Sequence, residues 1–234
     1  MTPRQAGPPK PPSKRPSAGS RSATAAAPTD EGVRHLRAAD PIMRRLVDAH
    51  GPLTLAERRR GRPKEAYGAL LRSIVGQQLS TKAARSIYER LAALFGGTAP
   101  APAELLAVEP EALRAVGLSW RKVDYLRDLA QRVEDESLDL RRLSGLSDDE
   151  VTAELTQVRG LGPWTADMFM IFHLGRPDVL PVGDLGTRAA VRREYELEAL
   201  PAPDELRRIA EPWRPHRSLA SLYLWRSLDA VPVT

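Results

Sequence analysis

Two glycines, Gly160 and Gly162, stand one residue apart between two segments of helical pattern. Because glycine tolerates positive φ, the chain can reverse tightly here and leave backbone N–H groups unpaired at the start of the second helix. Pro163 suits the first turn of that helix, where its missing N–H costs no hydrogen bond. Such donors, with the positive end of the helix dipole, fit a phosphate oxygen. An ordinary joint between two helices has the same pattern, and the spacing alone leaves both interpretations open.

Further along the chain, the carboxylate of Asp184 is a candidate functional group. Asp184 follows Pro181 and Gly183, a context that predicts a helix N-cap. The four histidines are scattered without metal-ligand spacing, and cysteine is absent. The sequence therefore gives no support for transition-metal catalysis, and it excludes disulfides, thiolate zinc sites, iron–sulfur clusters and cysteine nucleophiles.

The charge of the chain is distributed unevenly. Residues 1–30 carry a net charge of +4, from five basic side chains and one acid, so residues 31–234, with 30 basic and 29 acidic groups, are close to neutral. Within them, residues 58–90 hold nine Lys or Arg against two Glu, whereas residues 134–154 hold eight acids and two Arg. This uneven distribution of charge favours a molecule that presents one basic face to a polyanion. Solvated helix faces are the alternative explanation.

The elements that must position these residues read as helices throughout, and we predict an all-α fold. Ser80 and Ser147 are typical N-caps, the second within a capping box, and further helices are expected to begin near Pro163, Asp184, Pro203 and Arg217. An apolar stripe of helical period precedes Ser80, at Tyr67, Leu70, Leu71, Ile74 and Val75. No alternating strand pattern and no apolar run of membrane-spanning length occurs.

The N-terminal segment differs from the rest in composition. Residues 1–31 are rich in Pro, Ala and Ser with several basic residues, and they contain no aromatic side chain. Such a segment cannot bury enough apolar area to offset the entropy of ordering, so we predict a disordered tail followed by one folded domain at 32–234. The absence of cysteine and of a secretory segment is consistent with a cytoplasmic protein, associated with the nucleoid if the source is bacterial.

Four motifs in order carry a resemblance to a known family. They are IVGQQLS at 74–80, VRGLGPWTA at 158–166, LPVGDLG at 180–186 and WRPHRS at 213–218. Together they resemble the 3-methyladenine DNA glycosylase II family, a branch of the helix–hairpin–helix base-excision DNA glycosylases, over roughly residues 40–228. The resemblance implies two helical lobes with a cleft between them, and places the hairpin and Asp184 at the mouth of the cleft.

The resemblance also implies a reaction. A glycosylase of this kind hydrolyses the N-glycosidic bond of a flipped-out alkylated purine, such as 3-methyladenine or 7-methylguanine, and leaves an abasic site in base excision repair. The alkylated base is already cationic, so one carboxylate suffices: Asp184 would stabilise the oxocarbenium-like sugar and orient or deprotonate the attacking water. Trp164, Met168 and Trp225 would form the pocket for the extruded base, because cationic bases favour indole faces.

The hairpin residue Trp164 bears on the type of reaction. Bifunctional glycosylase–lyases of the superfamily carry a lysine at this position, and without its amine no Schiff base forms with the sugar. We therefore expect a monofunctional enzyme with no lyase activity. The same resemblance implies that the hairpin binds the DNA backbone through Arg159, Gly160, Leu161, Gly162 and Thr165. No cofactor is required, although such hairpins commonly hold a monovalent cation, Na⁺ or K⁺, which here would use the carbonyls of Thr156, Val158 and Leu161.

Extrusion of a base leaves a gap in the stack that a side chain must fill. The junction between two helices at Gln77, Gln78, Leu79 and Ser80 would supply this wedge, with Gln78 and Leu79 the foremost candidates. A plain interhelical turn is the alternative. Flanking phosphates would be contacted by Arg72, Lys82 and Arg85.

Two other functions are compatible with these patterns. A catalytically inert helix–hairpin–helix protein that binds damaged or bent DNA would need Gly160 and Gly162 but not Asp184. An all-α adaptor for protein partners would need neither, and its basic segment would only be solvated. The partner expected for the enzyme is double-stranded DNA with alkylated bases. We expect the protein to act as a monomer and not to bind a membrane.

Overall fold

The structure is a computed structural model that describes residues 28–229. Residues 1–27 of the predicted disordered tail at 1–31 lie outside the described residues. Helix α1 begins at Pro28, four residues before the predicted start of the folded domain at residue 32, and the domain boundary stays a prediction. Among the described residues no strand occurs, and the all-α fold class is confirmed.

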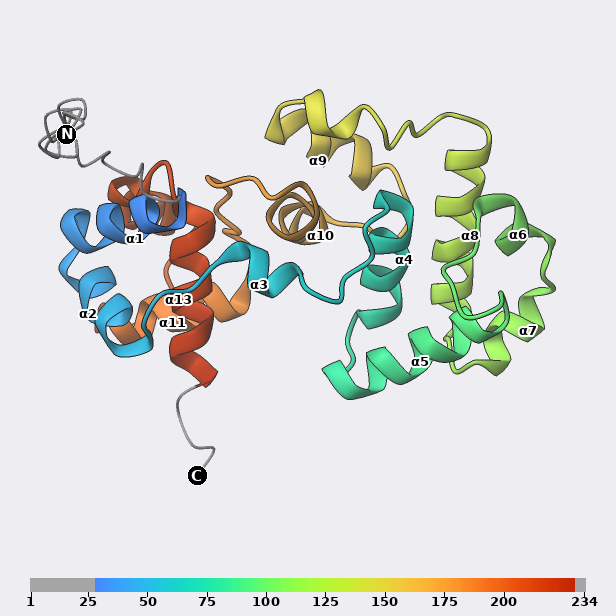
Figure 1. Cartoon of the computed structure of the whole chain (residues 1–234), viewed down its shortest axis with the longest axis horizontal. Coiled ribbons are helices and arrows are strands. Elements are labelled where there is room, and N and C mark those ends of the chain that lie inside the picture. Colours follow the sequence, from blue (N-terminus) through green and yellow to red (C-terminus); the bar gives the residue numbers. More distant parts are fainter. Residues whose placement is uncertain (1–27, 230–234) are drawn as a thin grey trace, which may run out of the picture.

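The helices follow one another with short connections (Figure 1). In chain order they are α1 (Pro28–Ala39), α2 (Pro41–His50), α3 (Leu55–Arg59), α4 (Ala66–Gly76), α5 (Thr81–Ala93), α6 (Pro102–Ala107), α7 (Pro110–Ala115), α8 (Trp120–Glu134), η1 (Leu143–Gly145), α9 (Asp148–Thr156), α10 (Pro163–Phe169), η2 (Met170–Leu174), α11 (Leu185–Glu194), α12 (Pro203–Ile209), η3 (Glu211–Trp213) and α13 (Arg217–Asp229). No helix in this range is both long and apolar enough to cross a membrane.

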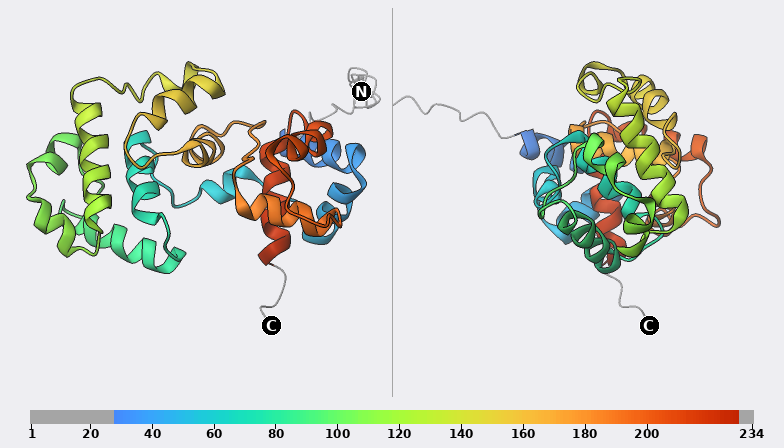
Figure 2. Two further views of the ribbon diagram at one scale, coloured as in Figure 1. Left: turned by 180° about the vertical axis from the view of Figure 1, so that it is seen from behind. Right: turned by 90° about the vertical axis from the view of Figure 1, so that its right-hand side faces the viewer.

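Two hydrophobic cores divide the helices into two lobes. The left view of Figure 2 shows these lobes as two groups of helices. The first lobe contains α4–α9, and the second contains α1, α2 and α11–α13. The chain crosses between them at α3 and again at α10 and η2, so the second lobe is built from both ends of the described chain. Leu55, Phe172 and Trp225 pack against both cores. The predicted pair of helical lobes is therefore confirmed.

Buried polar groups fix the second lobe. Asp40 is the N-cap of α2 and accepts hydrogen bonds from the N–H groups of Ile42 (2.8 Å) and Met43 (3.2 Å). Its other oxygen accepts from the indole of Trp213 at 2.9 Å and from the hydroxyl of Tyr195. A buried carboxylate with all of these donors is satisfied, so the N-cap also anchors η3 and the end of α11.

Caps set the elements that carry the site. Ser147 opens α9 through a capping box with Glu150, and Pro163 opens α10. Helix α10 continues into a π-helical turn, η2, which ends at Gly175 with φ +73° and which the sequence pattern did not indicate. Asp184 is the N-cap of α11, as predicted.

Candidate active site

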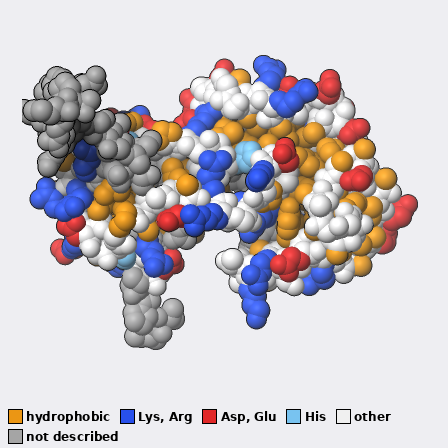
Figure 3. Space-filling view, in the orientation of Figure 1, with side chains coloured by type: hydrophobic (Ala, Val, Ile, Leu, Met, Phe, Trp, Pro, Cys, Tyr) orange, Lys and Arg blue, Asp and Glu red, His pale blue; other side chains and the backbone are white. Residues whose placement is uncertain are grey.

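A cavity of about 890 Å³ lies where the first lobe meets α10. Its wall is formed by α4, α5, the start of α8, the hairpin and α10. Figure 3 shows the surface hollowed between the lobes, with Lys and Arg side chains along the hollow. The predicted residues that line the cavity are Arg72, Gln77, Gln78, Leu79, Arg85, Gly160, Gly162, Trp164, Thr165 and Met168.

The carboxylate of Asp184 is surrounded by donors. Its Oδ1 accepts from the indole Nε1 of Trp164 at 2.8 Å. Its Oδ2 accepts from the indole Nε1 of Trp225 at 2.7 Å and from the N–H and hydroxyl of Thr187 at 2.6 and 2.9 Å. Asp184 itself is half-buried and does not line the cavity, but Trp164 does, with 43% of its surface exposed. The carboxylate therefore lies one indole hydrogen bond from the cavity wall.

Aromatic side chains continue this wall. Phe172 lines the cavity and stacks on Trp225, with ring centroids 5.8 Å apart and an interplanar angle of 29°. The guanidinium of Arg62 lies over the ring of Phe172, 4.2 Å from its centroid. Trp225 thus contacts both the aromatic wall and Asp184, and Met168 lies on the cavity side of α10.

The hairpin turns sharply at Gly160, which has φ +81°. A Cβ at this glycine would lie 2.1 Å from Cδ2 of Tyr125, so only glycine fits against the tyrosine ring. Asp128 accepts from the N–H of Arg159 at 2.9 Å and pairs with its guanidinium at 3.5 Å. The N–H groups of Gly160, Gly162 and Trp164 have no acceptor within residues 28–229, which leaves them available to an anion.

Two predicted hairpin residues are buried. Leu161 is 4% exposed in the core of the first lobe, and Thr165 is 3% exposed at the cavity wall, so neither side chain presents much surface to DNA. Their backbone remains part of the turn, and DNA binding by the hairpin at these residues stays a prediction.

The carbonyl groups predicted to hold a monovalent cation lie around the same turn. Val158 O accepts from the N–H of Leu161 at 3.1 Å, and within the described chain the carbonyls of Thr156 and Leu161 accept no hydrogen bond. Free carbonyl oxygens of this kind fit a hard cation, and the cation stays a prediction. In the described part of the chain no cluster of three or more His, Asp or Glu could hold a metal ion.

The predicted wedge lies at the turn between α4 and α5. Gln77 donates from Nε2 to the carbonyl of Gly160 at 2.7 Å, which ties this turn to the hairpin. Gln78 has φ +58°, and both it and Leu79 are exposed, Leu79 to 38%. Ser80 caps α5 by accepting from the N–H of Ala83 at 3.3 Å. Gln78 and Leu79 therefore stand at an exposed corner beside the cavity.

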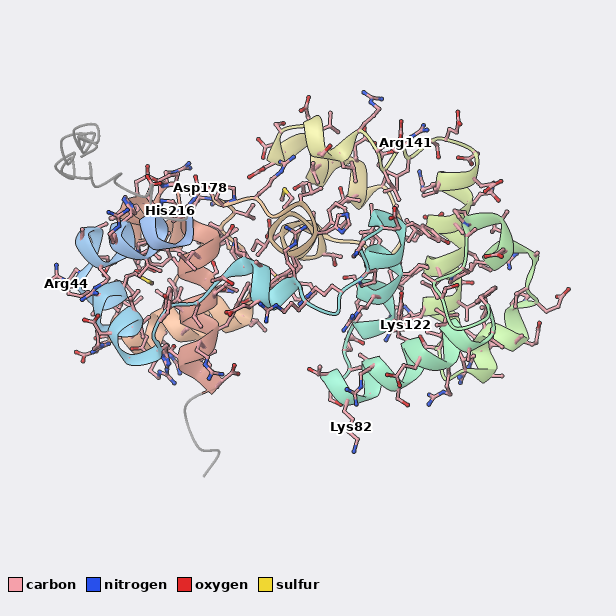
Figure 4. All side chains as sticks on the ribbon, in the orientation of Figure 1. Arg44, Lys82, Lys122, Arg141, Asp178 and His216 are labelled. Atoms are coloured by element: carbon pink, nitrogen blue, oxygen red, sulfur yellow. The ribbon has the colours of Figure 1, made fainter. Side chains whose placement is uncertain are left out.

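The three predicted phosphate contacts differ in their surroundings. Arg72 lines the cavity and donates to the carbonyl of Gly61 at 2.7 Å. Arg85 also lines the cavity and pairs loosely with Glu89 at 3.6 Å, with both side chains exposed. Lys82 is exposed and projects from the start of α5 (Figure 4).

Comparison with known proteins identifies the family. The family model of the HhH-GPD superfamily base excision DNA repair proteins matches residues 71–215, more than half of the chain. The chain belongs to this superfamily.

Relatives of this HhH-GPD protein carry names that agree with its family. DNA-3-methyladenine glycosylase 1 of Schizosaccharomyces pombe is 34% identical over 195 residues, which cover 82% of this chain and 85% of the relative. YfjP of Bacillus subtilis is 32% identical over 169 residues, and the match covers 70% of this chain but only 59% of YfjP. A solved structure of S. pombe 3-methyladenine DNA glycosylase (Mag1) in complex with abasic DNA has a TM-score of 0.78 and 32% identity, and covers 87% of this chain and 99% of that one.

Several residues of this HhH-GPD site were not found by sequence reasoning. Lys122, Tyr125 and Asp128 lie three residues apart on α8 and contact the wedge turn, Gly160 and Arg159 respectively. Their spacing on one helical face was a possible signal. Arg62 and Thr187 had no signal in the sequence, because their roles depend on the fold that brings them to Phe172 and Asp184.

Proposed function

We propose that this chain is a monofunctional DNA glycosylase that removes alkylated purines, such as 3-methyladenine and 7-methylguanine, from double-stranded DNA in base excision repair. The observation that carries the proposal is the Asp184 carboxylate, held by two indole N–H groups beside an aromatic cavity. Membership of the superfamily and the names of the relatives support it. The monomeric state and cytoplasmic location stay predictions.

The geometry suits a reaction in which the leaving base is already cationic. A base stacked against Trp164 and Phe172 would be held by electron-rich rings. Its sugar would then lie near Asp184, whose negative charge stabilises the cationic sugar as the glycosidic bond lengthens. The donors from Trp164, Trp225 and Thr187 fix the carboxylate in place, so little reorganisation is needed when the charge develops. The same carboxylate would orient or deprotonate the attacking water.

The absence of lyase activity rests on Trp164. Its indole occupies the hairpin position beside Asp184 and has no amine that could attack the sugar. Lys122 lines the cavity, but its ammonium is engaged with two backbone carbonyls. We therefore propose that the product is an intact abasic site.

DNA would be bound across the hollow between the lobes. The hairpin N–H groups would bind one phosphate, and Arg72, Lys82 and Arg85 would contact others. Gln78 and Leu79 would enter the space left by the extruded nucleotide. Such binding weakens steeply as salt concentration rises, because phosphate contacts release counterions. An affinity for DNA that does not respond to salt would favour the adaptor function instead.

The test is release of free base. Duplex DNA treated with a methylating agent is incubated with the wild-type protein and with Asp184→Asn, and the released purines are separated by chromatography. Asparagine is as good an N-cap as aspartate, so the variant keeps α11 but loses the charge. We expect release by the wild type and a loss of about 10²–10³-fold in the variant, typical of removing one group that stabilises transition-state charge. Equal release by both proteins would contradict the role of Asp184.

The same reactions separate the remaining alternatives. No release by the wild type, with salt-sensitive binding retained, would indicate a non-catalytic protein that binds damaged DNA. Strand scission without heat or alkali, in a duplex with one defined lesion, would contradict the monofunctional proposal. A panel of lesions in the same duplex then ranks the substrates.

A further inference from the structure

Lys122 has no role in the proposed reaction but supports the turn at 76–80, between α4 and α5. Lys122, in the first turn of α8, donates from Nζ to the carbonyls of Val75 at 2.8 Å and Gln77 at 2.7 Å. These carbonyls end α4, where the last groups of a helix have no intrahelical donor. Figure 4 shows Lys122 between α4 and α8. Burial lowers the pKa of Lys122, and the negative end of the α4 dipole compensates part of that cost.

The turn that Lys122 supports is conformationally demanding. Gln78 adopts φ +58°, a left-handed conformation that a residue with a Cβ takes up at a cost, so the surrounding structure must impose it. Gln78 and Leu79 are exposed, and the side chain of Gln77 is directed to the hairpin. Within residues 28–229, backbone hydrogen bonds, the side chain of Gln77 and the ammonium of Lys122 hold this turn.

The same face of α8 also supports the hairpin. Tyr125, one turn beyond Lys122, packs against Gly160, and Asp128, a further turn on, accepts from the N–H of Arg159. The bond from Gln77 Nε2 to Gly160 O closes the connection between the two loops. Helix α8 therefore fixes the distance between two loops: the hairpin, proposed to bind the DNA backbone, and the turn at 76–80, proposed to enter the base stack.

We propose that Lys122 is a positioning residue for base extrusion, which holds the turn at 76–80 so that Gln78 and Leu79 enter the duplex when the hairpin binds its backbone. This inference rests on the proposed function and assigns no contact with the reacting atoms to Lys122. It follows that Lys122 matters when the base must be unstacked and paired strands separated. It matters much less when the base is already unpaired.

The experiment compares two substrates that differ only in the need for extrusion. One oligonucleotide with a single 7-methylguanine is used as a perfect duplex and as a single strand, and release is followed in single-turnover reactions. The variants are Lys122→Met, which keeps the apolar stem but cannot donate, and Lys122→Arg, which can. Lys64→Met is the matched control, since Lys64 is exposed and does not line the cavity. Thermal unfolding is recorded for each protein.

We expect Lys122→Met to reduce release from the duplex by about tenfold, as befits the loss of hydrogen bonds from a charged donor. The expected change on the single strand is less than about twofold, and Lys122→Arg should recover most of the duplex rate. An equal loss on both substrates, or none on the duplex, would overturn the inference. If Lys122→Met does not fold, Lys122→Gln is tested in the same way.

A second readout does not depend on bond cleavage. A 2-aminopurine placed beside the lesion fluoresces when its neighbour unstacks, so binding of wild-type protein should raise the signal and binding of Lys122→Met should raise it less. If the wild type releases no base from either substrate, the proposed function fails. The fluorescence then still decides whether Lys122 positions the wedge.

Discussion

Asp167→Asn should stabilise the protein at pH 8 much more than at pH 5. Asp167 lies on α10, is half-buried and accepts no hydrogen bond within the described chain. Burial, together with the negative charges of Asp148 and Asp184, raises its pKa from 3.8 to about 7. The folded protein therefore keeps a proton that the unfolded chain has lost over most of this window.

The sign and size of the effect follow from this difference. Between the two pKa values the unfolded state binds fewer protons than the folded state, so the free energy of unfolding falls as pH rises from about 4 to 7. For a fully buried group this shift would correspond to about 4 kcal/mol. Because part of the carboxyl group is in contact with water, we expect about 1–2 kcal/mol. Asparagine has nearly the same shape and no charge, so the variant avoids this loss.

Urea unfolding at the two pH values measures the effect. We expect the difference in unfolding free energy between Asp167→Asn and wild type to grow by about 1–2 kcal/mol from pH 5 to pH 8. Asp124→Asn is the matched control, because Asp124 is an exposed acid on α8. A difference that is the same at both pH values would show that Asp167 is not protonated in the folded protein.

Two further substitutions test the site. Trp164→Phe keeps an aromatic wall but removes the 2.8 Å hydrogen bond to Asp184, and we expect base release to fall about tenfold with DNA affinity unchanged; an unchanged rate in single-turnover assays would mean that the indole N–H does not orient the carboxylate. Gly160→Ala forces a Cβ to 2.1 Å from Tyr125 at φ +81°, so DNA affinity in fluorescence titrations should fall about tenfold or more. Gly145→Ala is its control, because Gly145 lies outside the hairpin and a Cβ there meets nothing within 4 Å, and an equal loss in both would refute the argument from the turn.

Local signals in the sequence were sufficient for the elements and the family. Caps at Ser80, Ser147 and Asp184 mark helix starts that the structure places at those positions, because a side-chain acceptor next to an apolar stripe has few other uses. The motifs around the hairpin and Asp184 led to the superfamily that the family comparison confirms. The start of α1 was missed, since its first residues share the composition of the preceding tail.

The side-chain contacts within the site could not be predicted from the sequence. The indole of Trp225 reaches Asp184 across 41 positions of the chain, and the two meet only after α11 and α13 have packed together. The motif contains Leu161, but nothing in the motif indicates that its side chain enters the core, where the structure places it. A motif specifies residue types at positions, whereas the direction of each side chain depends on the packing of elements distant in sequence.

The hydrogen bond between Trp164 and Asp184 joins the helix after the hairpin to the second lobe. Trp164 starts the helix that follows the hairpin, whereas Asp184 starts α11 in the second lobe. Any displacement of the hairpin would therefore be transmitted to the carboxylate through one indole ring. The hairpin is itself fixed to α8 and to the wedge turn. If the hairpin binds a phosphate as proposed, that phosphate would set the position of the sugar of the extruded nucleotide relative to Asp184.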